Sequence, residues 1–477
     1  MKIRISKLFL YRHRFIIGYS LLGLVFASIL ILLPALSPGG LSQSEMQSAI
    51  DSNNLSINTL FTSEIVNLPY HLLQKASISI FGLSLYSVKL PSIILGFVTG
   101  ALIILLLNRW FKSNVAIISS AITVLSPLFL FLAGSGTPNI LYIFWIVLSL
   151  WLGSKIIGDK TQHPIIFCSL ILSFALAIYT PQFIYIALLV LLSVIIHPHI
   201  RFAIKILKIP QIITGFSIAL IVTIPLIVAS VIHPETISKL FWSDISSNYI
   251  ENIAAAFSPF FSFGSAIESV YLSPIFGLAT VSLVIIGIIA SASKLFTSRN
   301  TIISLLTIFT ILISGINTST AVIIFIPIAV LVAAAIEFIL ERWYSLFPEN
   351  PYARVIGVLP IATFTSIIVI SGFTYTIFGY HYSPAVASKF NNDITIVNQN
   401  LPENSTIFIP NNDLEYNFYK ILENSTSIKI TKDLPSSEIS TPVATLGKTE
   451  QNLELKLSKI ITSPKAQNSD RLYIYNN

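Results

Sequence analysis

Long uncharged stretches separated by short polar connections are the main pattern along this chain. The first stretch begins at Phe15, directly after a basic segment, and continues to Leu36. A helix needs roughly 20 apolar residues to cross the hydrocarbon core of a bilayer, and this stretch has that length. A secretory signal has a shorter apolar region of about 7–15 residues, followed by a small-residue cleavage site. We therefore expect an uncleaved first span.

Similar stretches recur as far as residue 378 and predict a mainly α, polytopic membrane helical bundle. We expect eleven spans, at residues 15–36, 90–107, 115–133, 139–156, 164–179, 182–197, 211–232, 273–293, 301–316, 320–340 and 355–378. Two of them, the fifth and the sixth, are short enough to be tilted or partly re-entrant. Composition agrees, because 54% of the 477 residues are hydrophobic and 10% are charged, whereas a soluble domain carries about 25% charged residues.

The basic residues predict the orientation of this bundle. With a cytoplasmic N-terminus (residues 1–14), most Lys and Arg residues of the membrane region fall in cytoplasmic connections. The opposite connections before residue 379 hold only Lys75, Lys89 and Lys239. Positively charged connections stay on the cytoplasmic side, so we expect a multi-pass protein of the cell membrane. The net charge of +7 does not indicate a nucleic-acid partner, since the basic residues form no patch beside aromatic RNA-binding motifs.

Two long outer loops interrupt the expected membrane domain (residues 15–378). They comprise residues 37–89 and residues 233–272. Long polar connections are where a site that faces one aqueous side can be assembled. We therefore expect the chemistry of this protein outside the membrane.

Polar composition from residue 379 to residue 477 predicts a small extracytoplasmic α/β domain. Short strands are expected at residues 406–409, 427–430, 442–446 and 471–475. Asn412 and Glu415 have the spacing of a capping box for a helix over residues 413–423. The apolar positions Leu453, Leu455, Leu457 and Ile460 suggest a second helix over residues 451–460.

Short motifs around the second and third spans carry a family resemblance. They are Leu68-Pro69-Tyr70, Phe81-Gly82, Lys89-Leu90-Pro91-Ser92 and Leu125-Ser126-Pro127. With these motifs the chain resembles the membrane-integral glycosyltransferases of the GT-C superfamily, in the protein-mannosyltransferase and aminoarabinose-transferase branch. The resemblance covers about residues 10–150 by motif and residues 150–378 by the layout of spans. It implies transfer of a sugar from a polyprenyl-phosphate donor to a cell-envelope acceptor, which is a glycan, a lipid or a protein.

The sequence departs from this family at its acidic positions. Members open the first outer loop with an Asp-Glu pair, but this chain has Ser44-Glu45. Where members often have a second acidic residue after the third span, this chain offers Asn139. A serine at pH 7 cannot remove the proton of an acceptor hydroxyl as a carboxylate does. Either Glu45, Asp51 or Glu64 takes this catalytic role, or the chain binds a lipid-linked sugar without transferring it.

Several further residues are candidates for binding the substrate. Lys75 and Lys89 lie on the side where the donor phosphate would sit, and charge-assisted contacts to phosphate are strong hydrogen bonds. The alternative for Lys89 is a snorkelling lysine that anchors the end of a span. His71 is expected on the polar face of an interfacial helix. In the second outer loop, His233 and Trp242 lie among aromatic residues, which form either a platform for a sugar or an interfacial belt.

The sequence indicates no certain cofactor. His233-Pro234-Glu235 lacks the further ligands that a metal site requires, although a divalent metal remains possible because some family members use one. A transporter would place ionisable residues near the middle of its spans, often in two repeated halves, and this chain has neither feature. A catalytically degenerate homologue, which binds lipid-linked sugars or acts as a scaffold, is the main alternative to a transferase.

Overall fold

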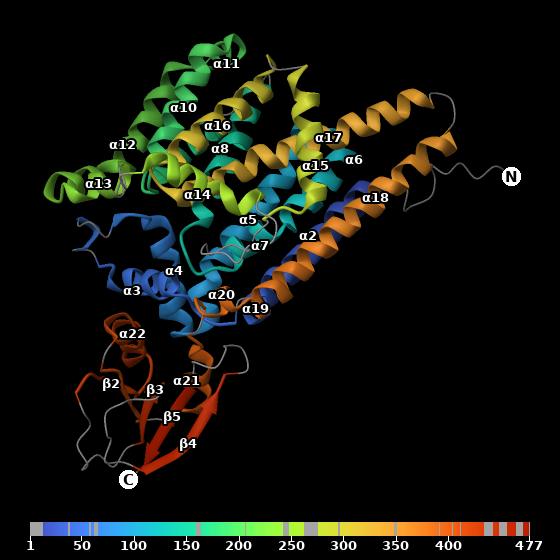
Figure 1. Cartoon of the computed structure of the whole chain (residues 1–477). Coiled ribbons are helices and arrows are strands. Elements are labelled where there is room, and N and C mark those ends of the chain that lie inside the picture. The colour runs from blue at the N-terminus through green and yellow to red at the C-terminus, as the bar shows by residue number, and fades with distance from the viewer. Residues whose placement is uncertain are drawn as a thin grey trace.

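The protein is described by a computed structural model in which helices predominate and a small sheet lies at the C-terminal end (Figure 1). The described residues are 13–36, 39–56, 59–61, 65–158, 164–205, 207–241, 248–261, 275–293, 296–347, 351–390, 392–402, 404–410, 412–433, 442–447, 456–463 and 471–476.

Six helical segments in these ranges are long and apolar enough to cross a membrane. They are α2 (Arg14–Leu36), α5 (Leu85–Trp110), α8 (Ile140–Gly158), α12 (Ile209–Ile232), α17 (Phe325–Leu346) with the preceding 3-10 helix η4 (Thr318–Ile324), and α18 (Pro351–Thr374) with the following π-helix η5 (Tyr375–Gly379).

Two bent helix pairs and three shorter apolar helices complete the bundle. The first pair, α6 (Ser113–Val124) and α7 (Pro127–Gly134), bends by 58°, and the second, α10 (Phe183–Ile196) and α11 (Pro198–Lys205), bends by 98°. Each bend falls where a proline begins the second helix, because proline donates no backbone hydrogen bond and disfavours a helical conformation of the residue before it. The shorter helices are α9 (Pro164–Ala177), α15 (Leu278–Ala292) and α16 (Ser298–Ser314). All eleven predicted stretches contain helix, so the helical bundle is confirmed.

Helix α5 lies at the centre of the bundle, where it packs against α2, α6, α7 and α8. A Cβ atom at Gly96 of α5 would lie 2.4 Å from the Cβ of Ala133 in α7. This position therefore needs glycine so that the two helices can approach closely. Helix α18, unlike the central helix α5, exposes apolar side chains on its surface, because Leu359, Ile367 and Ile370 are at least 60% exposed. An apolar surface of this kind suits contact with lipid better than contact with water.

The two long loops, residues 37–89 and 233–272, contain short helices of their own. The first long loop holds α3 (Gln43–Asn54), the 3-10 helix η2 (Thr59–Phe61) and α4 (Leu68–Phe81), and the second holds α13 (Glu235–Phe241) and α14 (Tyr249–Phe261). Backbone hydrogen bonds join both loops to the turn between α9 and α10. Asn67 N–H donates to Tyr179 O at 2.8 Å, and Gln182 N–H donates to Leu240 O at 2.7 Å. The two long loops therefore meet at the same end of the bundle.

A five-stranded mixed sheet forms the C-terminal end of the chain. Its strand order is β2-β1-β3-β5-β4, with β1 parallel to β2 and β3, and with β5 antiparallel to β3 and β4. The strands are β1 (Thr406–Phe408), β2 (Lys429–Thr431), β3 (Val443–Leu446), β4 (Lys456–Thr462) and β5 (Arg471–Asn476), and the accompanying helices are α19 (Tyr380–Tyr382), α20 (Pro384–Ala387), α21 (Ile394–Asn400), α22 (Asp413–Tyr419) and η6 (Lys420–Asn424).

The four predicted strands and the helix after Asn412 agree with this sheet, but the prediction of a second helix over residues 451–460 is wrong. Lys456–Thr462 is strand β4, in which Leu457 pairs with Tyr475. The leucines at 453, 455 and 457 recur at every second position, which is the period of a strand rather than of a helix. The first two of these leucines lie outside the described residues.

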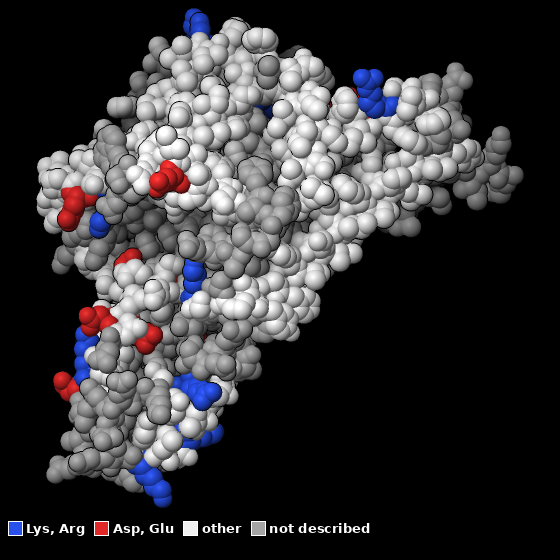
Figure 2. All heavy atoms as spheres, in the orientation of Figure 1, with Lys and Arg blue, Asp and Glu red and all other residues white. Residues whose placement is uncertain are grey.

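Charged side chains distinguish the two ends of the molecule on the face shown in Figure 2. They are sparse over the helical bundle and more frequent over the C-terminal sheet and α22. This distribution is the one expected for a bundle in lipid that carries a smaller part in water.

Candidate functional site

Helix α3 begins with a capping box that uses Glu45. Ser42 is the N-cap residue, and Glu45 N–H donates to Ser42 Oγ at 3.3 Å. In return, Ser42 N–H donates to Glu45 Oε2 at 2.9 Å. Such a reciprocal pair satisfies two backbone donors that the first turn of a helix leaves without partners.

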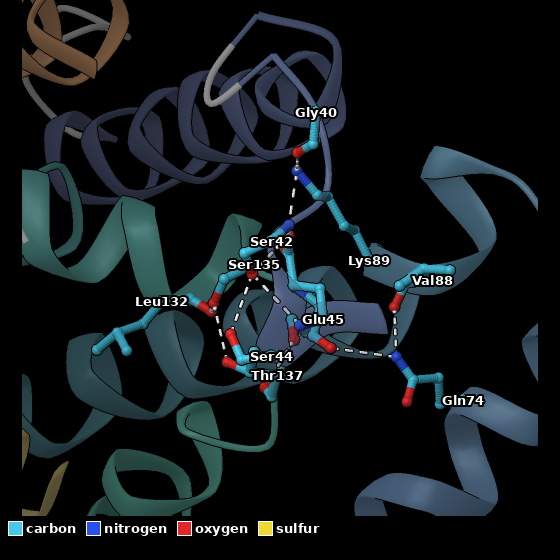
Figure 3. Close-up of polar contacts among 12 residues, drawn as sticks. Gly40, Ser42, Ser44, Glu45, Gln74, Val88, Lys89, Leu132, Ser135 and Thr137 are labelled. Atoms are coloured by element: carbon cyan, nitrogen blue, oxygen red, sulfur yellow. Dashed lines mark hydrogen bonds and ion pairs between the residues drawn. The ribbon is translucent and has the colours of Figure 1, made fainter. Parts of the chain in front are cut away.

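The other carboxylate oxygen of Glu45 ties α3 to the bundle (Figure 3). Gly136 N–H, in the turn after α7, donates to Glu45 Oε1 at 2.6 Å. Lys89 Nζ of α5 lies 3.8 Å from the same oxygen, and both side chains are fully inaccessible to solvent. Lys89 Nζ also donates to Gly40 O at 3.4 Å. The carboxylate of Glu45 is thus enclosed by protein groups and closed to solvent.

Gln74 of α4 connects the same elements through a buried network. Its Nε2 donates to Val88 O at 2.9 Å and to Gly136 O at 3.2 Å. Its Oε1 accepts from Ser48 Oγ at 2.8 Å and from Ser52 Oγ at 2.7 Å. Because one amide joins α3, α4, α5 and the turn after α7, the network fixes the first long loop against the bundle.

His71 continues this network instead of facing the interface. Its Nδ1 lies 2.8 Å from Ser52 Oγ, and the side chain is 5% exposed. Burial lowers the pKa of His71 to about 4, so the imidazole is neutral at pH 7. The Ser52 hydroxyl has acceptors at Gln74 Oε1 and Ser48 O, which favours the tautomer in which His71 Nδ1–H donates to Ser52.

The exposed face of α3 carries different residues. Ser44, at the position where the family has aspartate, is exposed, and so is Gln47. Asp51 follows on the same face, partly exposed, and accepts a hydrogen bond from Gln47 Nε2 at 2.7 Å. Burial raises the pKa of Asp51, although the Gln47 bond and the charge of Lys239 in α13 act in the opposite direction. The pKa of Asp51, in the first long loop, is therefore affected by the charge of Lys239 in the second.

Lys75 of α4 is partly buried and serves the other end of α3. Its Nζ donates to Asn53 O at 3.4 Å and also to Leu55 O. The last carbonyl groups of a helix have no partner within the helix, and a cation stabilises that negative end. Both predicted phosphate-binding lysines are thus engaged by protein groups, and their role toward a donor stays a prediction.

Two of the remaining predicted residues, Asn139 and His233, are described by the structure. Asn139 is half-buried just before α8. His233 follows α12, and its Nδ1 lies 3.8 Å from Glu235 Oε1. Glu64 and Trp242 lie outside the described residues. The described part of the chain holds no group of three or more His, Cys, Asp or Glu side chains that could bind a metal ion.

Sequence reasoning missed the residues that organise the cluster, chiefly Gln74, Ser52 and Gly136. Helical spacing contains a signal for two of them, because Gln74 lies three positions after His71, and Ser52 four positions after Ser48, so each pair shares a helix face. Gly136 contributes a backbone amide, which no residue type reveals.

The helical bundle described above is typical of a multi-pass membrane protein. Residues 69–228 match the family described as dolichyl-phosphate-mannose-protein mannosyltransferase. The chain resembles the glycosyltransferases of the GT-C superfamily and has their fold, as the sequence motifs predict.

Three solved structures illustrate this similarity. ArnT from Cupriavidus metallidurans in the apo state has 13% sequence identity, with a TM-score of 0.51 over 96% of this chain and 98% of that chain. The same protein bound to undecaprenyl phosphate has 14% identity and a TM-score of 0.54 over the same shares. The archaeal oligosaccharyltransferase AglB from Archaeoglobus fulgidus, in complex with an inhibitory peptide and a dolichol-phosphate, has 12% identity and a TM-score of 0.50 over 88% of this chain and 65% of that chain. No curated protein matches the sequence.

Proposed function

We propose that this chain is a membrane glycosyltransferase that moves a sugar from a polyprenyl-phosphate donor to a glycan, lipid or protein of the cell envelope, on the outer face of the membrane. The observation that carries the proposal is the fold, which aligns with ArnT bound to undecaprenyl phosphate over 96% of this chain. A donor of this kind has a long apolar tail and a charged head. An apolar bundle with two polar loops at one end offers an environment for each part.

Asp51 is the general base in this proposal. Its position on the exposed face of α3 supports the assignment, as does the raised pKa, since a more basic carboxylate accepts a proton more readily. Glu45 is inaccessible and already bound by Ser42, Gly136 and Lys89. Asp51 lies seven residues after Ser44, about 10 Å along the helix axis. The acceptor hydroxyl would accordingly react two turns further along α3 than in family members that have aspartate at the Ser44 position.

Binding of a lipid-linked sugar without transfer is the second candidate function. One observation favours it: the exposed position at the start of α3 carries Ser44, while the neighbouring acid, Glu45, is enclosed. A protein of this kind would still bind the lipid-linked sugar and would lack the base.

The test is transfer of a labelled sugar from a polyprenyl-phosphate donor to envelope acceptors by the purified chain in lipid nanodiscs, together with binding of the same donor. We expect Asp51→Asn to lower turnover about 100-fold or more, because a general base contributes about 10²–10⁴-fold, and to leave donor binding unchanged. Asp433→Asn makes the same chemical change at an exposed residue that follows β2, and serves as the control.

The two candidate functions give different results in this experiment. Donor binding with no transfer to any acceptor would support the second candidate and contradict the first. Transfer that persists in Asp51→Asn would remove Asp51 from the mechanism. Glu45→Gln is a poor probe of catalysis, because it leaves Lys89 buried without its counter-charge, a loss that costs about 3–5 kcal/mol of stability.

A further inference from the structure

The C-terminal part of the chain, from residue 390 onward, contacts the first long loop beside the buried Glu45–Lys89 pair. Leu41 and Asn392 form an isolated antiparallel β-bridge, in which Leu41 N–H donates to Asn392 O at 2.7 Å and Asn392 N–H donates to Leu41 O at 3.4 Å. The backbone passes so closely here that a Cβ atom at Gly40 would lie 2.6 Å from Phe390 O and 2.9 Å from Asn392 O. Glycine at position 40 is therefore required by contact with the C-terminal part.

Side chains reinforce this contact over a larger area. Tyr419 Oη donates to Asn392 Oδ1 at 2.7 Å, and Asn398 Nδ2 donates to Leu83 O at 2.9 Å. A single hydrophobic cluster includes Met46 and Ile50 of α3 together with residues of α21, α22 and the sheet. Helices α3 and α22 also pack directly against each other. The sheet and the first long loop thus share one core.

Residues Gly40 to Ser42, which lie at this contact, also bind the two members of the buried ion pair. Gly40 O accepts the hydrogen bond from Lys89 Nζ, and Ser42 caps the helix that carries Glu45. From Gly40 to Ser42, three consecutive residues bind the C-terminal part, the lysine and the start of α3. Because the same three residues make all of these contacts, we expect a displacement of the C-terminal part to be transmitted to the start of α3.

We propose that docking of the C-terminal part on Gly40–Leu41 positions α3, so that the region from residue 390 onward is a positioning element of the candidate site. The inference rests on the proposed function, since α3 carries the assigned base, Asp51. Gly40 and Asn392 are positioning residues in this scheme: they touch no substrate and act through the capping box and the ion pair.

The decisive variant is Gly40→Ala. It adds a methyl group that meets two backbone oxygens, and backbone atoms cannot move aside as a flexible side chain does. Gly153→Ala is the matched control, because a Cβ at Gly153 has nothing within 4 Å. The first readout is hydrogen exchange of the Gly136 amide, which donates to Glu45 Oε1 and so reports the position of a residue 91 positions away.

We expect faster exchange at Gly136 and Leu41 in Gly40→Ala, with no change in Gly153→Ala. In the transfer assay, kcat should fall by about 10- to 100-fold, because small displacements of catalytic groups have effects of this size. KM for the donor should stay within about twofold of wild type, since the proposed function assigns the polyprenyl tail to the apolar bundle and not to α3.

Tyr419→Phe keeps the test informative if Gly40→Ala does not fold. It removes the hydroxyl that binds Asn392 and lies on the C-terminal side of the contact, away from the ion pair. Faster exchange at Gly136 in this variant supports the inference. Unchanged exchange at Gly136, when exchange at Asn392 has accelerated, overturns it. The exchange readout needs no activity, so absence of transfer in the wild-type protein would contradict the proposed function and leave the positioning role to be decided by exchange.

Discussion

Ser44 and Glu45 are neighbours in the sequence and lie in opposite environments. Successive residues of a helix point about 100° apart, so the first turn of α3 exposes Ser44 and turns Glu45 into the bundle. There Glu45 meets a backbone amide and a lysine that are distant in the chain. Its role in the structure is to fix the start of α3, and this role follows from the carboxylate together with its burial.

His71 offers a test of the buried network through pH. Its pKa of about 4 in the folded protein lies below the ordinary value of 6.5. Between these two values the unfolded chain binds a proton that the folded protein excludes, so the free energy of unfolding decreases as pH falls from about 6.5 to 4. The full loss is about 3 kcal/mol. We expect His71→Asn, which keeps a donor but does not titrate, to lose less stability over this range.

Thermal unfolding of the two proteins at pH 7 and pH 4.5 measures this difference. His71→Asn should be less stable than the wild-type protein at pH 7, and the difference in stability between the two proteins should be smaller at pH 4.5. A gap of equal size at both pH values would mean that His71 is solvated and does not belong to a buried network.

At the scale of elements, the ends of helices account for much of the arrangement. Prolines mark the bends that divide α6 from α7 and α10 from α11. This effect is local, although the sequence analysis expected residues 115–133 as one unbroken span. The partner of a helix end is not local. The last carbonyl groups of α3 are bound by Lys75, which lies on another helix. In the sequence alone, a lysine shortly before a span fits a ligand of the donor phosphate as well as it fits a partner for a helix end.

Lys75→Met distinguishes these two roles. If Lys75 stabilises the end of α3, its removal should lower stability by about 1 kcal/mol, because a cation at a helix C-terminus contributes about that much when partly buried. Hydrogen exchange should then accelerate in residues 50–55 while KM for the donor stays unchanged. The exposed Lys456 of β4 provides the control variant, Lys456→Met. A higher KM with unaltered exchange would instead assign Lys75 to the donor phosphate.

At the scale of the whole molecule, the orientation expected from the basic residues places the sheet on the extracytoplasmic side of the membrane. The single cysteine, Cys168, can be replaced by serine so that new cysteines report their own exposure. Ser345, near the end of α17, is expected on the cytoplasmic side, and Asn424, at the end of η6, on the outer side; both are exposed.

In intact cells, a membrane-impermeant maleimide should label Asn424→Cys but reach Ser345→Cys only after permeabilisation. The opposite labelling pattern would reverse the orientation. It would also remove the outer face as the place of the proposed transfer.

The apolar stretches, the prolines and the short motifs by themselves determined that this chain is a helical membrane bundle that resembles GT-C glycosyltransferases. These features depend on a few neighbouring residues or on the solvent, so they can be recognised without knowing which residues are in contact in the folded protein. A strand near β4 can also be predicted, because leucine recurs at every second position from 453 to 457. Only the tertiary structure decided that Glu45 is enclosed with Lys89, that Gln74 joins four elements, and that Gly40 lies against Asn392. These contacts join residues far apart in sequence, and burial, which sets the chemistry of each group, arises only when the chain is packed.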